Sequence, residues 1–379
     1  MRVALVHEFL TQLGGAERVL QAFHELFPQA HVYTLVYDEA KTRGAFRGWD
    51  IRASYLQKLP GGVKHYKWYL PLMAGATERF DLSRYDLVLS DSSAFAKGVS
   101  VKKPARHVCY CHTPTRYLWE SMDEYLAESK YPALVRLAAK LYLKYFLKNW
   151  DLRAAGRPDI MIANSRTVQD RIYKYYGRGS QVVYPPVDTE FFKRAEGEKE
   201  AEGEYYLTAS RLEPYKKIDI VIDAFAKLNL SLKVAGDGTQ AEELRSKYQV
   251  SSIRFLGRVS DAELRKLYSG AKAFVFPALE DAGIMILEAL ACGAPVIGLA
   301  AGGTAEFVRD GENGVLFDEQ SADDIIAAVG RFESMRFAAE GLRESVLRYD
   351  KERFKTAILG IIHNLTPALS DIGEGERVR

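Results

Sequence analysis

Two glutamates, Glu280 and Glu288, stand with seven residues between them in the segment LEDAGIMILEALACGAP (279–295). Such a carboxylate pair could supply the acid and nucleophile of a glycosidase, half of a metal site, or two acceptors for a polar ligand. The apolar run AFVFPAL (273–279) predicts a strand, so Glu280 lies on the loop that leaves it. The run IMILEALAC predicts a helix that contains Glu288.

The predicted helix decides between these uses of the two carboxylates. Eight residues of α-helix rise by about 12 Å, whereas the carboxyl groups of a retaining glycosidase are about 5–5.5 Å apart. A metal site is disfavoured because no Asp-x-Asp motif or His cluster lies nearby. We therefore expect Glu280 and Glu288 to accept hydrogen bonds from hydroxyl groups along an extended ligand. Backbone amides near Gly283 and Ile284 would then face a phosphate.

A pair of cations stands in SRLEPYKKID (210–219). Arg211 ends a predicted strand and Lys216 follows five positions later, with Pro214 stiffening the turn between them. A planar guanidinium and a point-like ammonium that converge at a strand end suit a diphosphate. Solvated surface charges are the alternative interpretation of the same pair.

Two glycines, Gly14 and Gly15, separate a predicted strand from a predicted helix in HEFLTQLGGAER (7–18). Glycine lets the backbone approach a ligand closely, and the free amides at a helix start favour an anion. The pair does not form a GxGxxG motif, and most double glycines are simple turns, so this signal alone is weak.

The elements that must position these residues alternate between strands and helices. Short apolar runs that end in polar residues predict parallel strands buried on both faces: RVALVH (2–7), HVYTLVY (31–37), DLVLSDS (86–92), ARHVCYCH (105–112) and DIMIANS (159–165). The charged, proline-containing stretch 182–212 interrupts this rhythm, which then restarts. We therefore predict an α/β protein with two Rossmann-like doubly wound domains facing a central cleft.

Composition restricts the classes of function. The chain has 379 residues, 27% of them charged, and a net charge of +2, which gives no global argument for binding nucleic acid. Three cysteines cannot make a disulfide framework, which fits a reducing compartment. The apolar run at the start, in MRVALVHEFL, is too short for a signal-peptide core, and no stretch approaches the uncharged length of a membrane span. We expect a cytoplasmic protein that at most attaches to a membrane surface.

Cys109, Cys111 and His112 spell C-x-C-H, a pattern that could indicate zinc. Alternate residues of a strand point to the same face, so both thiols could converge. No second Cys or His cluster completes four ligands, and Cys292 lies in a helix of the other predicted domain. Buried small apolar residues are therefore the favoured interpretation.

The order of motifs along the chain resembles the retaining glycosyltransferases of family 4, which have the two-domain GT-B fold. The segment EDAGIMILEALACGAPVI, followed by GGTAE (302–306), is similar to the E-x7-E signature of that family. Further family-like segments appear in order: LGGAERVL, CYCHTPTRYLWE, IANSRTVQDRI, VVYPPVDTEFF, SRLEPYKKIDIVIDAF, VAGDG and FLGRVSDAEL. The chain looks most like bacterial mannosyltransferases of lipopolysaccharide and exopolysaccharide assembly, which use GDP-mannose. Ala282 stands where relatives often have Phe, a departure that bears on the shape of the donor pocket.

The resemblance implies roles around the reacting bond. Arg211 and Lys216 would hold the donor diphosphate, and Gly15 would approach it from the first domain. Glu280 would bind the donor hexose and His112 would face the reacting sugar, although a lone His is more often structural. Turnover would rest on stabilising the departing diphosphate, with no metal or other cofactor.

The remainder of the donor site is implied in the same way. Glu288 would bind the ribose hydroxyls, and the backbone near Arg258 and Val259 would flank the base. The other expected donor-binding residues belong to the glycine turns: Gly14, Ala282, Gly283 and Ile284.

The GT-B fold also implies domain boundaries. An acceptor-side domain would span 1–190 and a nucleotide-sugar-binding domain 191–351. The terminal segment 352–379 is expected to pack back on the first domain, which would make that domain discontinuous.

Two stretches are both basic and aromatic: VKHYKWYLPLMAG (63–75) and VRLAAKLYLKYFLKNW (135–150). A helix with a Lys/Arg stripe beside an aromatic and aliphatic face fits binding to anionic lipid at a membrane surface. An amphipathic helix whose apolar side faces the protein core is the alternative for each stretch.

Together these patterns predict a retaining transferase that moves mannose from GDP-mannose to a lipid-linked saccharide. The expected place is the inner face of the cytoplasmic membrane, with no nucleic-acid partner. A UDP-sugar-dependent transferase of the same fold is the first alternative, because no residue that we can name fixes the base. A non-catalytic, two-lobed sugar-binding protein is the second.

Overall fold

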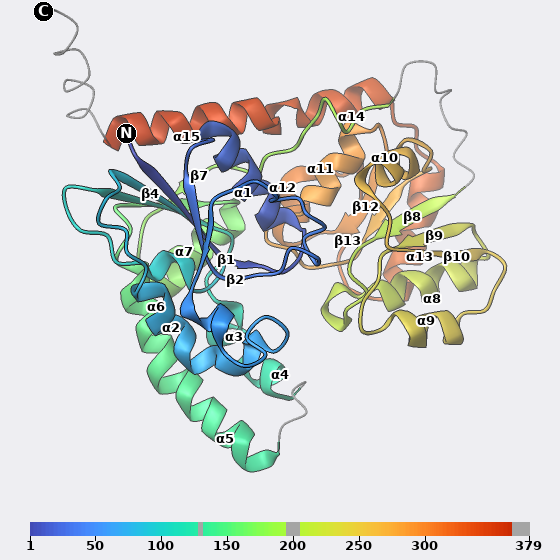
Figure 1. Cartoon of the computed structure of the whole chain (residues 1–379). Coiled ribbons are helices and arrows are strands. Elements are labelled where there is room, and N and C mark those ends of the chain that lie inside the picture. The colour runs from blue at the N-terminus through green and yellow to red at the C-terminus, as the bar shows by residue number, and fades with distance from the viewer. Residues whose placement is uncertain (128–131, 195–204, 366–379) are drawn as a thin grey trace, which may run out of the picture. The chain divides into compact units, whose positions relative to one another are not determined.

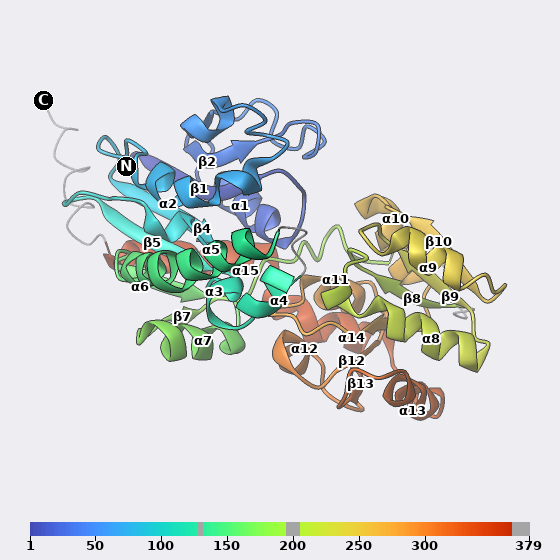
Figure 2. The ribbon, with the colours of Figure 1, turned by 90° about the horizontal axis from the view of Figure 1, so that it is seen from below.

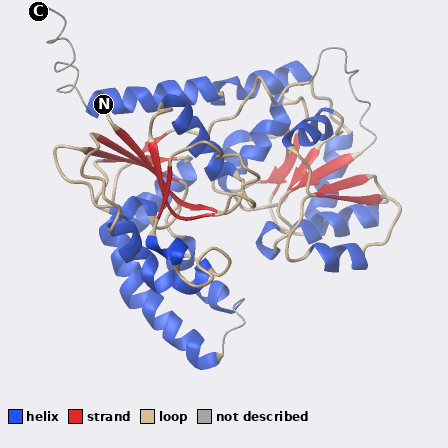
Figure 3. Cartoon of the chain, viewed as in Figure 1, coloured by secondary structure: helices blue, strands red, loops and turns tan. Residues whose placement is uncertain are grey.

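The computed structural model describes residues 1–127, 132–194 and 205–365. The chain divides into two compact units, each of which is a sheet covered by helices (Figure 3). Unit 1 comprises 1–185 and 354–379, of which 366–379 lie outside the described residues, and unit 2 comprises 186–353. The expected α/β fold with two doubly wound domains is confirmed.

Unit 1 is built on a seven-stranded sheet with the order β3-β2-β1-β4-β5-β6-β7, and all of its strand pairs are parallel. The strands are β1 (Val3–Leu10), β2 (His31–Tyr37), β3 (Ile51–Ala53), β4 (Leu87–Ser92), β5 (Arg106–Cys111), β6 (Ile160–Ala163) and β7 (Gln181–Val182). The order reverses between β1 and β4, so the loops after these two strands run to opposite faces of the sheet. In such sheets, ligands bind at this reversal, beyond the carboxyl ends of the strands.

Helices cover both faces of the unit 1 sheet (Figure 2). One face is packed by α1 (Gly15–Leu26) and α15 (Lys351–Leu365). The other is packed by α2 (Leu70–Glu78), α6 (Lys148–Ala155) and α7 (Arg166–Tyr176). The shorter or peripheral elements are η1 (Tyr55–Lys58), η2 (Tyr66–Tyr69), η3 (Ala96–Gly98), α3 (Arg116–Trp119), α4 (Met122–Ala127), α5 (Ala133–Leu141) and the π-helical η4 (Tyr142–Leu147).

The last described helix, α15, packs against unit 1 (Figure 1). Phe354 stacks on Phe23 of α1, with ring centroids 5.7 Å apart, and meets the edge of Tyr110 of β5. Ile358 and Ile362 are buried in the same apolar cluster. Unit 1 is therefore discontinuous in sequence, and its first segment ends at Pro185.

Unit 2 contains a six-stranded sheet with the order β10-β9-β8-β11-β12-β13, and its strand pairs are also parallel. The strands are β8 (Tyr206–Ala209), β9 (Leu232–Ala235), β10 (Ile253–Gly257), β11 (Phe274–Phe276), β12 (Val296–Leu299) and β13 (Gly314–Phe317). The helices are η5 (Pro214–Lys216), α8 (Ile218–Leu228), α9 (Ala241–Lys247), α10 (Asp261–Ser269), α11 (Ile284–Ala291), α12 (Gly302–Phe307), α13 (Ala322–Glu333), α14 (Ala339–Val346) and η6 (Leu347–Tyr349). Among the helices in the described ranges, none is long and apolar enough to cross a membrane.

Candidate active site

Lys216 and Glu280 lie together at the carboxyl edge of the unit 2 sheet. Lys216 ends η5, which follows β8, and Glu280 lies on the loop after β11, the strand that pairs with β8. The ammonium of Lys216 donates to Oε1 of Glu280, and the two side chains are only 12% and 24% exposed. The structure thus joins two residues that are 64 positions apart, where parallel sheets place their ligands.

Tyr215 lies close to both cations of the η5 loop. Its hydroxyl oxygen accepts a hydrogen bond of 2.5 Å from Nη2 of Arg211. The ring centroid is 5.9 Å from the Arg211 guanidinium and 5.1 Å from the Lys216 ammonium. Tyr215 was not among the site residues predicted from the sequence, although its place between the cations in RLEPYKK was an available indication. The ring helps to hold both cations through cation–π contacts.

Glycines fix the loop that carries Glu280. The amide of Gly303, at the start of α12, donates to the carbonyl of Glu280 at 2.8 Å. A Cβ on Gly302 would lie 2.4 Å from that carbonyl oxygen, and one on Gly303 would lie 2.7 Å from Cα of Ala282. Gly283 caps α11 in the left-handed conformation, with φ 60°. The two glycines of GGTAE therefore shape the Glu280 loop, a role that the sequence analysis did not assign.

Glu288 lies in the second turn of α11 and its side chain is buried. Ala282 is also buried, while Gly283 and Ile284 are partly exposed at the start of the helix. The two glutamates of the signature thus have different surroundings: Glu280 is ion-paired on a loop and Glu288 is enclosed in a helix.

Arg258 and Val259 follow β10, two strands from β8 at the same edge of the sheet. Between them and Arg211 lies the VAGDG turn after β9. A Cβ on Gly236 would lie 1.8 Å from the carbonyl oxygen of Ser210, so this turn packs directly on the start of the Arg211 loop. The amide of Gly236 also donates to the carbonyl of Gly257 at the end of β10, at 2.7 Å, so the loops after β8, β9 and β10 lie side by side.

In unit 1, His112 belongs to a row of three side chains from neighbouring strands. It follows β5, and its Nε2 is hydrogen-bonded to Oδ1 of Asp91 on β4. The other oxygen of Asp91 lies 3.0 Å from Nδ1 of His7 on β1. Nε2 of His7 lies 3.7 Å from Oε1 of Glu17 on α1. Of these residues, His112 was predicted from the sequence, whereas His7, Asp91 and Glu17 were not.

Asp91 controls the ionisation of both imidazoles. Burial alone would lower the pKa of His7, but the charge and hydrogen bond of Asp91, helped by Glu17, outweigh it and raise that pKa to about 10. The pKa of His112 is likewise raised, because the contribution of Asp91 exceeds the cost of burial. Burial would raise the pKa of Asp91, but the two histidines lower it. The group is therefore a buried carboxylate held between two cationic rings.

Gly14 and Gly15 adjoin this row at the start of α1. Gly14 has extended backbone, with φ −153°, and a Cβ there would lie 3.2 Å from Oε2 of Glu17. Gly15 is the first residue of the helix. His112, Gly14 and Gly15 thus belong to unit 1, and the other predicted site residues belong to unit 2.

Cys109 and Cys111 are fully buried in one apolar cluster with Met161 and Val168. Burial raises the pKa of the Cys109 thiol to about 12. Within residues 1–127, 132–194 and 205–365, no group of His, Cys, Asp and Glu side chains is arranged to hold a metal ion.

Comparisons with known proteins match both halves of the chain. The profile described as Glycosyltransferase Family 4 matches residues 13–191, and that described as Glycosyl transferases group 1 matches residues 189–353. The D-inositol 3-phosphate glycosyltransferase of Streptomyces bingchenggensis is 29% identical over 47% of this chain and 46% of its own length. The GDP-mannose-dependent alpha-(1-6)-phosphatidylinositol monomannoside mannosyltransferase of Mycolicibacterium smegmatis is 27% identical over 54% of this chain and 61% of its own. The matched part spans about half the length of such relatives.

Solved structures resemble nearly the whole chain. Anabaena Alr3699/HepE, in complex with UDP and glucose, has a TM-score of 0.70 at 20% identity and covers 96% of this chain and 99% of its own. Sucrose-phosphate synthase from Thermosynechococcus elongatus has a TM-score of 0.74 at 16% identity, with 97% and 100% covered. These likenesses show the fold, and the two profiles together account for residues 13–353. The chain belongs to the family 4 glycosyltransferases of the GT-B fold.

Proposed function

We propose that this glycosyltransferase moves mannose from GDP-mannose to a lipid-linked saccharide and retains the anomeric configuration. The observation that carries the proposal is the Lys216–Glu280 ion pair, with Arg211 close by in the same loop. It places cations that suit a diphosphate directly beside a carboxylate that suits sugar hydroxyls. A similar protein named as GDP-mannose-dependent supports the choice of donor.

The proposed reaction uses the charges of this site. As the bond from the anomeric carbon to the donor phosphate breaks, negative charge grows on the leaving diphosphate, and Lys216, Arg211 and the amides at Gly283 and Ile284 stabilise it. The acceptor hydroxyl attacks from the same face, and its proton passes to a phosphate oxygen of the leaving group. No metal takes part in this route.

Measured release of nucleoside diphosphate tests the donor. We expect release of GDP from GDP-mannose when a lipid-linked saccharide is present, and a product with the donor's anomeric configuration by NMR. A second candidate is a UDP-sugar donor, favoured by the similar Anabaena protein solved with UDP and glucose. Turnover of UDP-glucose in place of GDP-mannose would select that candidate. Binding of both without turnover would indicate a sugar-binding protein instead.

Replacing Glu288 tests its proposed contact with the ribose. A charge-assisted hydrogen bond contributes about 1.5–3 kcal/mol, so Glu288→Ala should weaken donor binding about 10- to 100-fold. The bond is the same in the bound ground state and the transition state, so turnover should fall less. Calorimetric titration with GDP-mannose and steady-state kinetics measure the two effects.

Two further variants complete the Glu288 test. Glu288→Gln keeps the buried shape and separates loss of charge from loss of packing. Glu344→Ala removes an exposed carboxylate of α14 and should change neither quantity. Normal donor affinity with abolished turnover in Glu288→Ala would contradict the ribose assignment and indicate a catalytic carboxylate.

We also propose that unit 1 attaches to an anionic membrane through the helical stretch from α5 to α6. Its inner side packs into the core through Leu143, Leu147 and Trp150. Its outer side exposes large apolar residues, with Leu134 79% and Phe146 71% exposed. In α5, which is described in full, no side chain is buried, and Figure 1 shows α5 extending away from the strands of unit 1. Both the lipid-facing and the core-facing interpretations thus find support, on opposite sides of one stretch.

Vesicle sedimentation tests the attachment. Lys140 pairs with Asp123 at 2.6 Å, so Arg136 and Lys144 are the better targets. Each basic residue near an anionic surface contributes about 1 kcal/mol, so Arg136→Ser/Lys144→Ser should lower the partition onto phosphatidylglycerol vesicles about tenfold or more. The difference should shrink as salt rises. Equal sedimentation of this variant and the wild type at low salt would show that the outer side does not meet lipid.

A further inference from the structure

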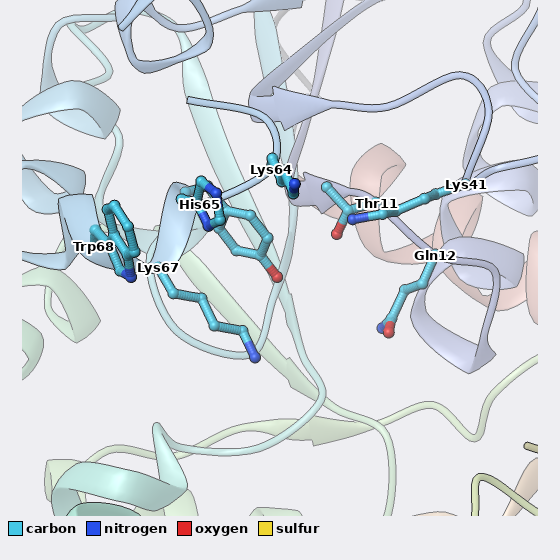
Figure 4. A pocket seen from close by; sticks show the side chains of 8 residues that line it. Thr11, Gln12, Lys41, Lys64, His65, Lys67 and Trp68 are labelled. Carbon is cyan, nitrogen blue, oxygen red and sulfur yellow. The ribbon is translucent and has the colours of Figure 1, made fainter. Parts of the chain in front are cut away.

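Unit 1 contains a hollow of about 400 Å³ at the carboxyl edge of its sheet (Figure 4). Its lining comes from the loops after three adjacent strands: Thr11 and Gln12 after β1, Lys41 after β2, and residues 64–68 after β3. It therefore lies on the β1–β2–β3 side of the sheet, whereas the His7–Asp91–His112 row lies on β1, β4 and β5. The hollow is thus distinct from that row but shares its edge of the sheet, where such folds bind ligands.

The hollow is strongly positive. Three ammonium groups line it, from Lys41, Lys64 and Lys67, and Figure 4 shows Lys41 and Lys64 pointing toward Thr11. None of the eight described lining residues carries a carboxylate. A counter-charge, Asp38, lies 3.8 Å from the Lys41 ammonium. Cations gathered around a concave surface repel one another and attract a bound anion.

Neutral hydrogen-bond donors complete the lining, and aromatic contacts hold residues 65–68 in place. The hydroxyls of Thr11 and Tyr66 and the amide of Gln12 can donate to phosphate oxygens. The ring of Trp68 stacks on His65, with centroids 4.4 Å apart, and Tyr66 packs on Phe9 at 4.8 Å. The site is therefore largely formed before a ligand arrives.

The bend before residues 64–68 is held by close backbone packing and a hydrogen bond. A Cβ on Gly62 would lie 2.1 Å from the carbonyl oxygen of Leu56. The hydroxyl of Tyr69 donates to the carbonyl of Pro60 at 2.6 Å. Lys64 and Lys67 thus extend from a loop with a defined path.

We propose that this hollow binds the phosphate or diphosphate group of the acceptor. Three ammonium groups and several hydroxyl and amide donors match phosphate oxygens, and the volume leaves room for part of the attached sugar. The identification of the ligand as the acceptor rests on the proposed transferase function. The recognition of phosphate rests on the lining residues alone.

Titration of the full chain with inorganic pyrophosphate tests the anion site without turnover. Because Arg211 and Lys216 are proposed to bind a diphosphate in unit 2, the titration uses an Arg211→Gln/Lys216→Gln background. Saturable binding should remain there, and adding Lys64→Gln/Lys67→Gln should weaken it about tenfold, because Lys64 and Lys67 are exposed and solvent-exposed charge pairs each contribute little. Unchanged pyrophosphate affinity after that addition would overturn the proposal.

Controls separate the hollow from general charge and from lipid. Lys102→Gln/Lys174→Gln removes the same charge from exposed positions of unit 1 outside the hollow and should keep full pyrophosphate binding. Lys64→Gln/Lys67→Gln should sediment with phosphatidylglycerol vesicles as the wild type does. Loss of vesicle binding with intact pyrophosphate binding would assign these lysines to a lipid surface and overturn the acceptor site.

Kinetics connect the site to the acceptor. In the otherwise unaltered enzyme, Lys64→Gln/Lys67→Gln should raise the acceptor KM about tenfold and leave the donor KM unchanged. Weaker pyrophosphate binding with an unchanged acceptor KM would overturn the assignment to the acceptor. If the chain transfers no sugar but its pyrophosphate binding still depends on Lys64 and Lys67, the proposed function is rejected and the anion site is kept.

Discussion

Lys216→Ala is expected to lower turnover by about 10²–10³-fold, the range found when one preorganised donor to a developing negative charge is removed. Charge on the departing diphosphate is greater in the transition state than in the bound donor. The ammonium therefore stabilises the transition state more, and kcat should fall more than donor affinity. Steady-state kinetics and calorimetric donor titration measure the two quantities separately.

The ion pair with Glu280 offers a second explanation for a loss of turnover in Lys216→Ala. Further variants separate the two explanations. If Lys216 acts only by holding Glu280, then Glu280→Ala should lose as much turnover, and the double variant should lose no more. If Lys216 acts on the diphosphate, Lys216→Ala should lose more than Glu280→Ala, and Lys216→Arg should restore part of the rate. Lys227→Ala, which removes an exposed ammonium from α8, should be neutral. A normal kcat with a raised donor KM would contradict the proposed role of Lys216.

The local sequence pattern was sufficient to predict the elements that carry the E-x7-E signature. Apolar runs and glycines predicted a strand, a loop with Glu280 and a helix with Glu288, and the structure has β11, that loop and α11 at these places. Each of these predictions uses only neighbours in the chain. The same locality explains the success of the two-domain α/β prediction.

Contacts between distant segments needed the strand order, which no local pattern contains. The Lys216–Glu280 pair depends on β8 lying beside β11, and the link between His112 and Asp91 depends on β4 lying beside β5. Asp91 could have been selected, because DLVLSDS was recognised as a strand that ends in polar residues. Its two histidine partners could not be assigned without the order β1-β4-β5.

The basic, aromatic stretches show a different limit of prediction from sequence. One amphipathic pattern could face lipid or the core, and in the stretch from α5 to α6 opposite sides have different surroundings. In the other stretch, Lys64 and Lys67 line a hollow that also needs the loops after β1 and β2. Periodicity gives the faces of a helix but not what lies against each face.

Asp91→Asn is expected to destabilise unit 1 by about 3–5 kcal/mol near pH 6, because removing one partner of a buried ion pair leaves the other charge uncompensated. The carboxylate accepts hydrogen bonds from His7 and His112, and all three side chains are largely buried. Asp50→Asn is the matched control, since Asp50 pairs with Arg52 at the surface. That change should cost no more than about 1 kcal/mol.

The pH dependence distinguishes this cluster from a simple packing defect. The pKa of His7 is about 10 in the folded chain and about 6.5 when unfolded. Its stabilising contribution is therefore complete below about pH 6.5 and is lost as pH rises toward 10. The pKa of Asp91 is lowered by folding, so its contribution is present above about pH 4 and is lost in stronger acid.

Unfolding in urea at pH 6 and pH 9.5 measures the prediction for Asp91. The difference between the wild type and Asp91→Asn should be largest at pH 6 and clearly smaller at pH 9.5, because His7 and His112 lose their charge toward high pH. An imidazole NMR titration should show His7 still protonated at pH 8 in the wild type and neutral in Asp91→Asn, where burial prevails. An equal loss of stability at both pH values, with His7 neutral at pH 8 in both proteins, would show that Asp91 serves packing and hydrogen bonding without holding a charged histidine.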